Sequence, residues 1–270
     1  ARLYHVPTKK LLYIWNNYND SVIESVLSPQ YQVDAQNPST KPQQLTQYLT
    51  IVSLDGIVEI YDIVALRQYI STQTSLLNDT TIQTDDNEPL FSFDNENFQP
   101  ITTIELALDI SVIAWHPILP IISIGTSTGE LYISDLCRDY NLITIFGHIE
   151  SINALKFSYD GSLLFSAGAD GYINISPIKI PDSLQSTEEA TKIYDILSKG
   201  IDVPTERLSY YNITNATSGV IPVISLCQLP PTPNNRTYTL IVGLANGDTG
   251  VIQYNQHTVS KIISKNQTAI

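Results

Sequence analysis

A serine between two glycines is the feature of this chain that most resembles a catalytic nucleophile. Residues 125–129 read Gly-Thr-Ser-Thr-Gly, which matches the G-x-S-x-G pattern of serine hydrolases. In those enzymes the serine stands on a sharp turn between a strand and a helix. Here residues 130–135 alternate polar and apolar side chains, which is typical of a strand. We therefore predict that the motif is a hairpin turn and that Ser127 is not a nucleophile.

The histidines and cysteines are not spaced as metal ligands or redox pairs. They are His5, His116, His148, His257, Cys137 and Cys227. None has a second ligand at the short spacing of zinc sites or of Cys-x-x-Cys motifs. We expect both cysteines to be packed thiols, and the sequence has no glycine-rich phosphate loop. The chain is predicted to have no catalytic activity, no metal and no cofactor.

A repeated pattern of short strands dominates the rest of the chain, and its clearest copy spans residues 147–178. Apolar residues alternate with polar ones over 152–157, 163–167 and 172–176, and Asp-Gly pairs stand at 160–161 and 170–171. Period-two runs separated by turns that tolerate a positive φ indicate an antiparallel meander.

The other copies are shorter and are recognised by a turn glycine before an alternating strand. These glycines are Gly56, Gly129, Gly171 and Gly247, separated by 73, 42 and 76 residues. One gap fits the roughly 40–45 residues of a four-stranded propeller blade, and the other two exceed it by about thirty residues. Residues 2–6 and 10–15 read as the last strands of a preceding blade.

This pattern resembles the WD-repeat family of β-propellers, as a degenerate member of unclear subfamily. Gly147-His148 matches the family's Gly-His, and Tyr61-Asp62 and Ser134-Asp135 stand where the family has Trp-Asp. Ser176-Pro177 replaces that pair in the clearest copy. The resemblance implies that three residues of this copy belong to the family's buried hydrogen-bond network, namely His148, Ser166 and Asp170.

The fold that the resemblance implies is all-β, with four-stranded antiparallel blades. About four to five blades are visible, as part of a seven-bladed ring, with one inserted helix. We expect a single, partial propeller domain over residues 1–270. Because an incomplete ring exposes apolar blade faces, we expect further blades that lie in the rest of a longer chain, are too divergent to recognise in this sequence, or come from a partner.

Two insertions interrupt the blades. Residues 71–100 form an acidic segment that includes Phe91 and Phe93, and it is either a disordered surface loop or a segment that docks on a basic partner. Residues 179–218 contain a predicted helix at about 187–199. Its apolar stripe packs on the propeller's own rim or docks on a neighbouring subunit. The stripe consists of Ala190, Ile193, Tyr194 and Leu197.

Charge limits the choice of partner. The chain has 14 Lys and Arg residues against 27 Asp and Glu residues, a net charge of −13. Such a balance disfavours direct binding to nucleic acid and favours protein partners with basic surfaces. No apolar stretch is long enough to span a bilayer. Seven Asn-x-Ser/Thr sequons would suit a secreted protein, but an intracellular location, cytoplasmic or nuclear, fits the cysteine usage better.

Two functions remain open from the sequence. The first is a non-catalytic scaffold that mediates protein–protein interactions as a subunit of an intracellular complex. The alternative is a peptide reader that binds a basic or modified tail in the propeller funnel, for example in a chromatin, transcription or ribosome-assembly complex.

Overall fold

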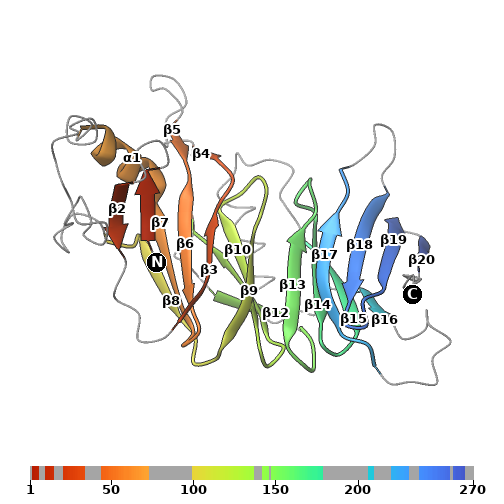
Figure 1. The fold of residues 1–270 in the computed structure, drawn as a ribbon. Coiled ribbons are helices and arrows are strands. Elements are labelled where there is room, and N and C mark those ends of the chain that lie inside the picture. Colours follow the sequence, from red (N-terminus) through yellow and green to blue (C-terminus); the bar gives the residue numbers. More distant parts are fainter. Residues whose placement is uncertain are drawn as a thin grey trace. The chain divides into compact units, whose positions relative to one another are not determined.

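The computed structural model describes residues 2–5, 10–14, 21–33, 44–72, 99–136, 142–145, 147–178, 206–209, 220–230, 237–255 and 258–264. These residues form two compact units, Ala1–Ala107 and Leu108–Ile270 (Figure 1). Nearly all of the described elements are strands, and they form four sheets of four antiparallel strands and two hairpins. The predicted all-β architecture of four-stranded blades is therefore confirmed.

The first unit contains one blade, in the strand order β3–β6–β7–β8. Its strands are β3 (Val22–Leu27), β6 (Tyr48–Ser53), β7 (Ile57–Asp62) and β8 (Thr102–Glu105). The turn between β6 and β7 contains Gly56, as the repeat predicts. Residues 73–98, most of the predicted acidic insertion, lie between β7 and β8 and outside the described residues.

Two hairpins accompany this blade. The strands predicted for the leading piece are present as β1 (Arg2–His5) and β2 (Lys10–Ile14), which pair as a hairpin; their place in a preceding blade stays a prediction. The second hairpin pairs β4 (Tyr31–Val33) with β5 (Gln44–Thr46) and is inserted between β3 and β6.

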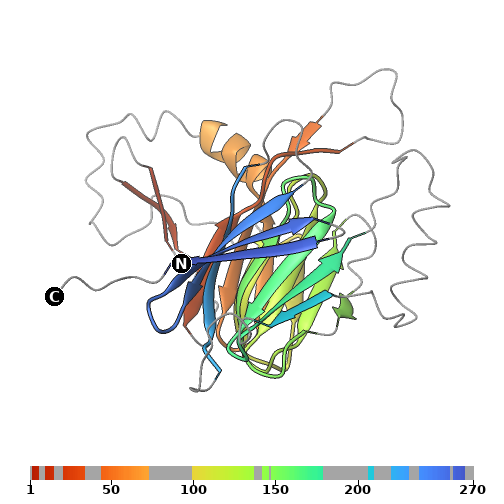
Figure 2. The same cartoon turned by 90° about the vertical axis from the view of Figure 1, so that its right-hand side faces the viewer.

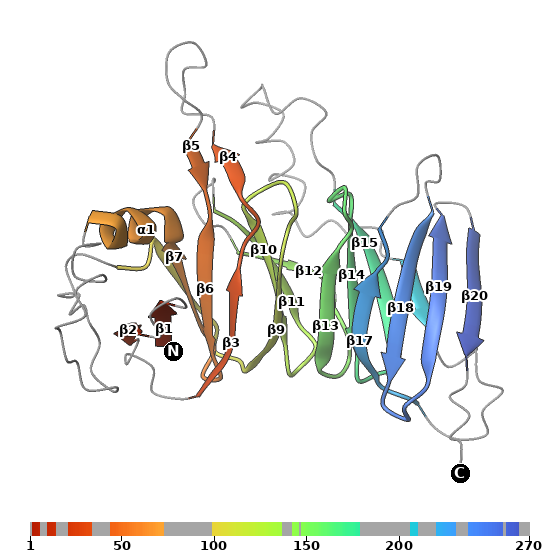
Figure 3. The same ribbon diagram turned by 45° about the horizontal axis from the view of Figure 1, so that its top comes forward.

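The helix α1 (Ile63–Thr72) follows β7 without a loop and was not predicted. Oδ1 of Asp62 accepts hydrogen bonds from the N–H groups of Val64 (2.8 Å) and Ala65 (3.4 Å), so Asp62 is the N-cap. Leu66 is fully buried, and α1 packs against β5 and β6 (Figure 3). The aspartate that matched the Trp-Asp pair thus begins a helix. The predicted helix at 187–199 lies outside the described residues.

The second unit contains three blades, which we number two, three and four (Figure 2). Blade two consists of β9 (Ile110–Trp115), β10 (Ile121–Thr126), β11 (Leu131–Asp135) and β12 (Leu142–Ile145). Blade three consists of β13 (Ile152–Phe157), β14 (Leu163–Gly168), β15 (Tyr172–Pro177) and β16 (Glu206–Ser209). Blade four consists of β17 (Val223–Gln228), β18 (Tyr238–Leu244), β19 (Thr249–Asn255) and β20 (Thr258–Ser264).

Blade three confirms the three strands predicted for the clearest copy to within one residue. Its fourth strand, β16, lies inside the segment 179–218 that the sequence indicated as an insertion, and it pairs with β15. That segment therefore also completes the blade. Within the described part of the chain, no helix is long and apolar enough to cross a membrane.

The core of the second unit lies between the faces of neighbouring blades. Leu131 and Ile133 of blade two pack with Ile152 and Leu164 of blade three. The other face of blade three packs against blade four through a larger cluster, which includes Phe165 and Ile173 on one side and Leu240, Val242 and Ile252 on the other. Because successive strand residues point to opposite faces, blade three is apolar on both.

Candidate protein-docking site

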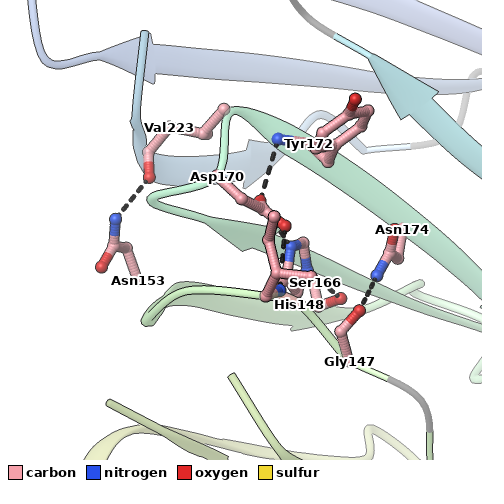
Figure 4. Close-up of polar contacts among 9 residues, drawn as sticks. Gly147, His148, Asn153, Ser166, Asp170, Tyr172, Asn174 and Val223 are labelled. Carbon is pink, nitrogen blue, oxygen red and sulfur yellow. Dashed lines mark hydrogen bonds and ion pairs between the residues drawn. The ribbon is translucent and has the colours of Figure 1, made fainter. Parts of the chain in front are cut away.

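A buried polar network holds the turn between β14 and β15. Nδ1 of His148 lies 2.8 Å from Oδ1 of Asp170, and Nε2 lies 2.9 Å from Oγ of Ser166 (Figure 4). Asp170 also accepts hydrogen bonds from the N–H groups of Ile149 (3.2 Å) and Tyr172 (3.1 Å). The structure thus brings together the three residues that the resemblance singled out, and all three are buried. We call residues 168–171 the network turn.

The network keeps Asp170 ionised. Burial alone would raise the pKa of its carboxyl group, but the hydrogen bond and charge of His148 and the two backbone N–H groups outweigh burial and lower that pKa. Gly168 makes room for the imidazole, because a Cβ there would lie 2.6 Å from Nδ1 of His148.

Two asparagines extend the network, and the sequence did not indicate either role. Nδ2 of Asn174 donates to the carbonyl of Gly147 at 2.5 Å, and Asn174 is buried although it begins a glycosylation sequon. Nδ2 of Asn153 donates to the carbonyl of Val223 at 2.8 Å and so joins blade three to blade four (Figure 4). These bonds fix the start of blade three against its own third strand and against its neighbour.

Backbone hydrogen bonds hold the turns at the end where this network lies, within blade two, between blades two and three, and within blade four, in that order. Ser127 N–H donates to the carbonyl of Asp109 (2.9 Å), and His148 N–H donates to that of Gly129 (2.8 Å). Ala245 N–H donates to the carbonyl of Pro222 (3.0 Å). We call the residues of these turns the network end, which comprises 108–110, 126–130, 147–151, 168–172, 220–222 and 245–248.

The network end combines projecting aliphatic side chains with negative charge. Ile149 is 70% exposed and Val220 is 56% exposed. The six segments contain no Lys or Arg. Besides buried Asp170 they contain four carboxylates, of which two are exposed and two are half-buried; these are Asp109, Glu150, Glu130 and Asp248. Such a surface suits non-covalent docking to a basic protein.

The turn between β13 and β14, which we call the clamped turn (residues 158–162), is held by neighbouring blades. From blade two, Nδ1 of His116 accepts the N–H groups of Ile118 (3.1 Å) and Leu119 (3.0 Å), so Nε2 carries the proton and donates to the carbonyl of Gly161 (3.1 Å). His116 is fully buried and lies edge-on to the Phe157 ring, with 5.1 Å between centroids.

The ionisation of His116 reflects this burial. Burial lowers its pKa and outweighs the carbonyl of Gly161 and the carboxylates of Asp135 and Asp160, which act in the opposite direction. The ring is therefore held in its neutral form.

From blade four, a tyrosine holds the same turn. The hydroxyl of Tyr238 donates to Oδ2 of Asp160 at 2.7 Å and lies 3.0 Å from Oγ of Ser162. Oδ1 of Asp160 accepts bonds from the hydroxyls of Ser158 (2.5 Å) and Ser162 (2.9 Å) and from Ser162 N–H (3.1 Å). Burial alone would raise the pKa of Asp160, but these hydrogen bonds lower it.

The glycine–serine motif occupies a hairpin, as predicted. Residues 125–129 cover the end of β10 and the turn that leads to β11, and Gly129 has a φ of 95°. Glu130 N–H donates to Oγ1 of Thr126 at 2.9 Å, which closes the turn. Ser127 is followed by a strand and not by a helix.

The other candidate groups are possible metal ligands, the two cysteines and the predicted docking residues. Among the described residues, no three His, Cys, Asp or Glu side chains are grouped so that they could hold a metal. The expectation of a packed thiol is wrong for Cys227, because it points away from the core of blade four and is exposed. Cys137 lies outside the described residues, and so do the predicted docking residues Phe91, Phe93, Ala190, Ile193, Tyr194 and Leu197. Those docking residues stay predictions.

The network end itself was missed, although the sequence contains a signal for it. Ile149 is an apolar residue in a turn, between a histidine and a glutamate, where a polar residue is the ordinary choice. The spacing of the repeat shows which residues begin a blade, but not which of them project into solvent.

Comparisons with known proteins support the same fold. Residues 140–175 match the family model described as "WD domain, G-beta repeat". The WD repeat-containing protein JIP5 of Phaeosphaeria nodorum is 30% identical over 130 residues, which is 40% of this chain and 29% of JIP5. The chain thus spans less than a third of the length of that relative.

Crystal structures of Sqt1 from two organisms are among those similar to this fold. Sqt1 of Saccharomyces cerevisiae has a TM-score of 0.52 at 14% identity, over 81% of this chain and 48% of Sqt1. Sqt1 from Chaetomium thermophilum has a TM-score of 0.51 at 15% identity, over 94% of this chain and 51% of Sqt1. The chain spans about half the length of each.

Proposed function

We propose that this chain, which carries a WD repeat in a β-propeller fold, is a non-catalytic scaffold that docks a basic protein on its network end. The observation that carries the proposal is the composition of that end. It combines two projecting aliphatic side chains, four carboxylates that are exposed or half-buried, and no Lys or Arg.

The charge of the chain supports this class of partner. Four carboxylates at one end of the second unit, in a chain with a net charge of −13, attract Lys and Arg side chains and repel phosphates. Because rim charges act mainly on the rate of association, the apolar pair at Ile149 and Val220 must supply most of the affinity.

The wider role is the assembly of an intracellular multi-protein complex. The predicted docking residues in the insertions 71–100 and 179–218 would provide separate contacts with other subunits. Further blades, from the same protein or from a partner, would leave the network end free, since blades pack through their faces and not through their turns.

The test compares two positions on the second unit. A photo-crosslinking amino acid replaces either Thr128, which is exposed in the network end, or Tyr159, which is 49% exposed in the clamped turn. Each full-length variant is irradiated in an extract of the cells that make the protein. We expect one predominant adduct from position 128, formed with a basic protein and reduced when the salt concentration is raised.

A charge control accompanies this comparison. Glu150→Gln should reduce the yield of the adduct at position 128, whereas Asp135→Asn should leave it unchanged, because Asp135 ends β11 outside the network end. Adducts that form only from position 159, or an adduct that is insensitive to salt and to Glu150→Gln, would contradict the proposal.

A further inference from the structure

We infer that the partner at the network end is a folded protein with an apolar hollow rimmed by Lys or Arg, and that Ile149 enters this hollow. The inference rests on the proposed function and adds the shape of the partner. It also distinguishes the scaffold from a reader of extended tails.

Ile149 projects from a backbone that is held rigidly. Its N–H donates to Oδ2 of Asp170 at 3.2 Å, and the residue before it, His148, is buried and bonded through both ring nitrogens. The side chain of Ile149 is nevertheless 70% exposed. The fixed backbone loses little conformational freedom when a partner covers it, and a β-branched side chain has few rotamers to lose, so this isoleucine is preorganised for docking.

Val220 is a second exposed apolar side chain, and it lies against the network turn. A Cβ at Gly171 would lie 2.8 Å from Cγ1 of Val220, so Val220 rests directly against the network turn. Ile149 is bonded to Asp170 and Val220 touches Gly171, and adjacent residues of one turn therefore position both side chains.

The exposure of these side chains determines the shape of the partner. A protein that captures an extended tail places its apolar side chains in the walls of a groove, where they are largely covered. Ile149 and Val220 instead stand out, with exposed fractions of 70% and 56%. A projecting isoleucine is desolvated only when the partner surrounds it, which requires a hollow.

The carboxylates near Ile149 determine which side chains of the partner surround the hollow. Glu150 follows Ile149 directly and is exposed, and Glu130 lies in the turn whose Gly129 carbonyl accepts the N–H of His148. Carboxylates beside a buried apolar contact are matched best by Lys or Arg around the hollow, because an uncharged rim would desolvate them without compensation.

The experiment uses the partner identified through the crosslink at position 128, purified in its folded form. Its affinity is measured by isothermal titration calorimetry for the full chain and for Ile149→Ala. We expect Ile149→Ala to weaken binding roughly 10- to 100-fold, as for the loss of a central aliphatic contact. The control Ile118→Ala removes a side chain that is 53% exposed beside the clamped turn, and it should change the affinity less than about twofold.

Overlapping 15-residue peptides that cover the sequence of the partner provide the second measurement. We expect none of them to compete with the intact partner. A single basic peptide that binds as tightly as the intact partner would overturn the inference in favour of a tail reader. The thermal midpoint of Ile149→Ala should match that of the parent chain, because the side chain is exposed.

The outcomes separate the two proposals. If the crosslink at position 128 forms and Ile149→Ala binds like the parent chain, the shape of the partner is wrong and the docking site stands. If no adduct forms at position 128, both proposals are wrong.

Discussion

The network turn and the clamped turn of blade three have the same Asp-Gly sequence but are held in different ways. Gly161 and Gly171 each have a φ of 72°, and each follows an aspartate that accepts several hydrogen bonds. The side chains that bind Asp170 come from blade three itself, whereas the clamped turn is held by His116 of blade two and Tyr238 of blade four.

This difference shows which hydrogen bonds the sequence of a single repeat can specify. A bond within one blade joins two positions of the same repeat, so a repeated sequence can specify it. The bonds from His116 and Tyr238 come from neighbouring blades, so the sequence of blade three alone does not specify them. We therefore expect substitutions in the clamped turn to affect the packing of three blades, and substitutions in the network turn to act on blade three and the network end.

The largest expected effect comes from Gly161→Ala in the clamped turn. A Cβ there would lie 2.1 Å from Nε2 of His116, and the φ of 72° is unfavourable for alanine. The strained backbone and the lost hydrogen bond to His116 together should lower the free energy of unfolding by about 3 kcal/mol. Urea unfolding of the full chain measures this loss.

Gly247→Ala is the matched control. Gly247 also has a positive φ, of 84°, but a Cβ there would meet no atom within 4 Å. The backbone penalty alone should cost about 1 kcal/mol. Equal losses for the two variants would show that the contact with His116 contributes nothing.

The second-largest expected effect is the loss of stability when Asp170 is substituted, which we compare with the same substitution at Asp160. Asp170→Asn replaces a buried, ionised acceptor of three hydrogen bonds by an amide that cannot satisfy all of its donors. We expect a loss of about 2–3 kcal/mol in the free energy of unfolding, again measured in urea.

Asp160→Asn should cost less, about 1 kcal/mol, because Asp160 is exposed and water can replace its partners. If Asp160→Asn destabilised the chain more than Asp170→Asn, the clamped turn would be the stronger of the two and the comparison would be reversed.

These two turns also show how far the sequence predicts the structure. Alternation and Asp-Gly pairs located the strands of blade three to within one residue, and the Gly-His resemblance selected the residues that meet around Asp170. Both signals are local, because the residues that interact lie within a single repeat.

The parts that were missed depend on contacts outside the repeat or on competition between local structures. Asp62 matched a strand-ending aspartate, yet its carboxylate caps α1, because two backbone N–H groups lie within its reach. The partners of His116 and Tyr238 lie 45 and 78 residues away, at Gly161 and Asp160, beyond the range of any pattern. The exposure of Ile149 likewise depends on how the turns of blades two and three assemble.

The dependence of stability on pH tests the histidine of the clamped turn. The pKa of His116 is lowered in the folded chain, so the unfolded chain binds a proton first as the pH falls below about 6.5. Stability due to His116 is therefore complete above that pH and declines as the pH falls from about 6.5 toward the folded-state pKa. His116→Asn removes this titration.

Urea midpoints at pH 7.5 and pH 5 should differ more for the parent chain than for His116→Asn. Asp160 and Asp170 of blade three affect stability in a lower pH range than His116. Their pKa values are lowered from the ordinary value of a carboxyl group, which is itself below that of an imidazole. Their contribution is present above about pH 3.9 and is lost as the pH falls below it. Equal pH dependence in the parent chain and His116→Asn would exclude a role for this ring.

The smallest expected effect comes from removing the hydrogen bond that Tyr238 of blade four makes to the clamped turn. Tyr238→Phe removes the hydroxyl that donates to Asp160 at 2.7 Å and keeps the ring that packs on Phe165, at 6.2 Å between centroids. We expect a loss of about 0.5 kcal/mol in the free energy of unfolding. Tyr159→Phe, the control, removes a weaker bond of 3.4 Å to the carbonyl of Gln228 and should cost a few tenths of a kcal/mol at most.

A double-mutant experiment tests whether Tyr238 acts through Asp160. In the background of Asp160→Asn, the cost of Tyr238→Phe should shrink, because the two residues share one hydrogen bond. Independent costs would mean that the contact from blade four does not act through Asp160.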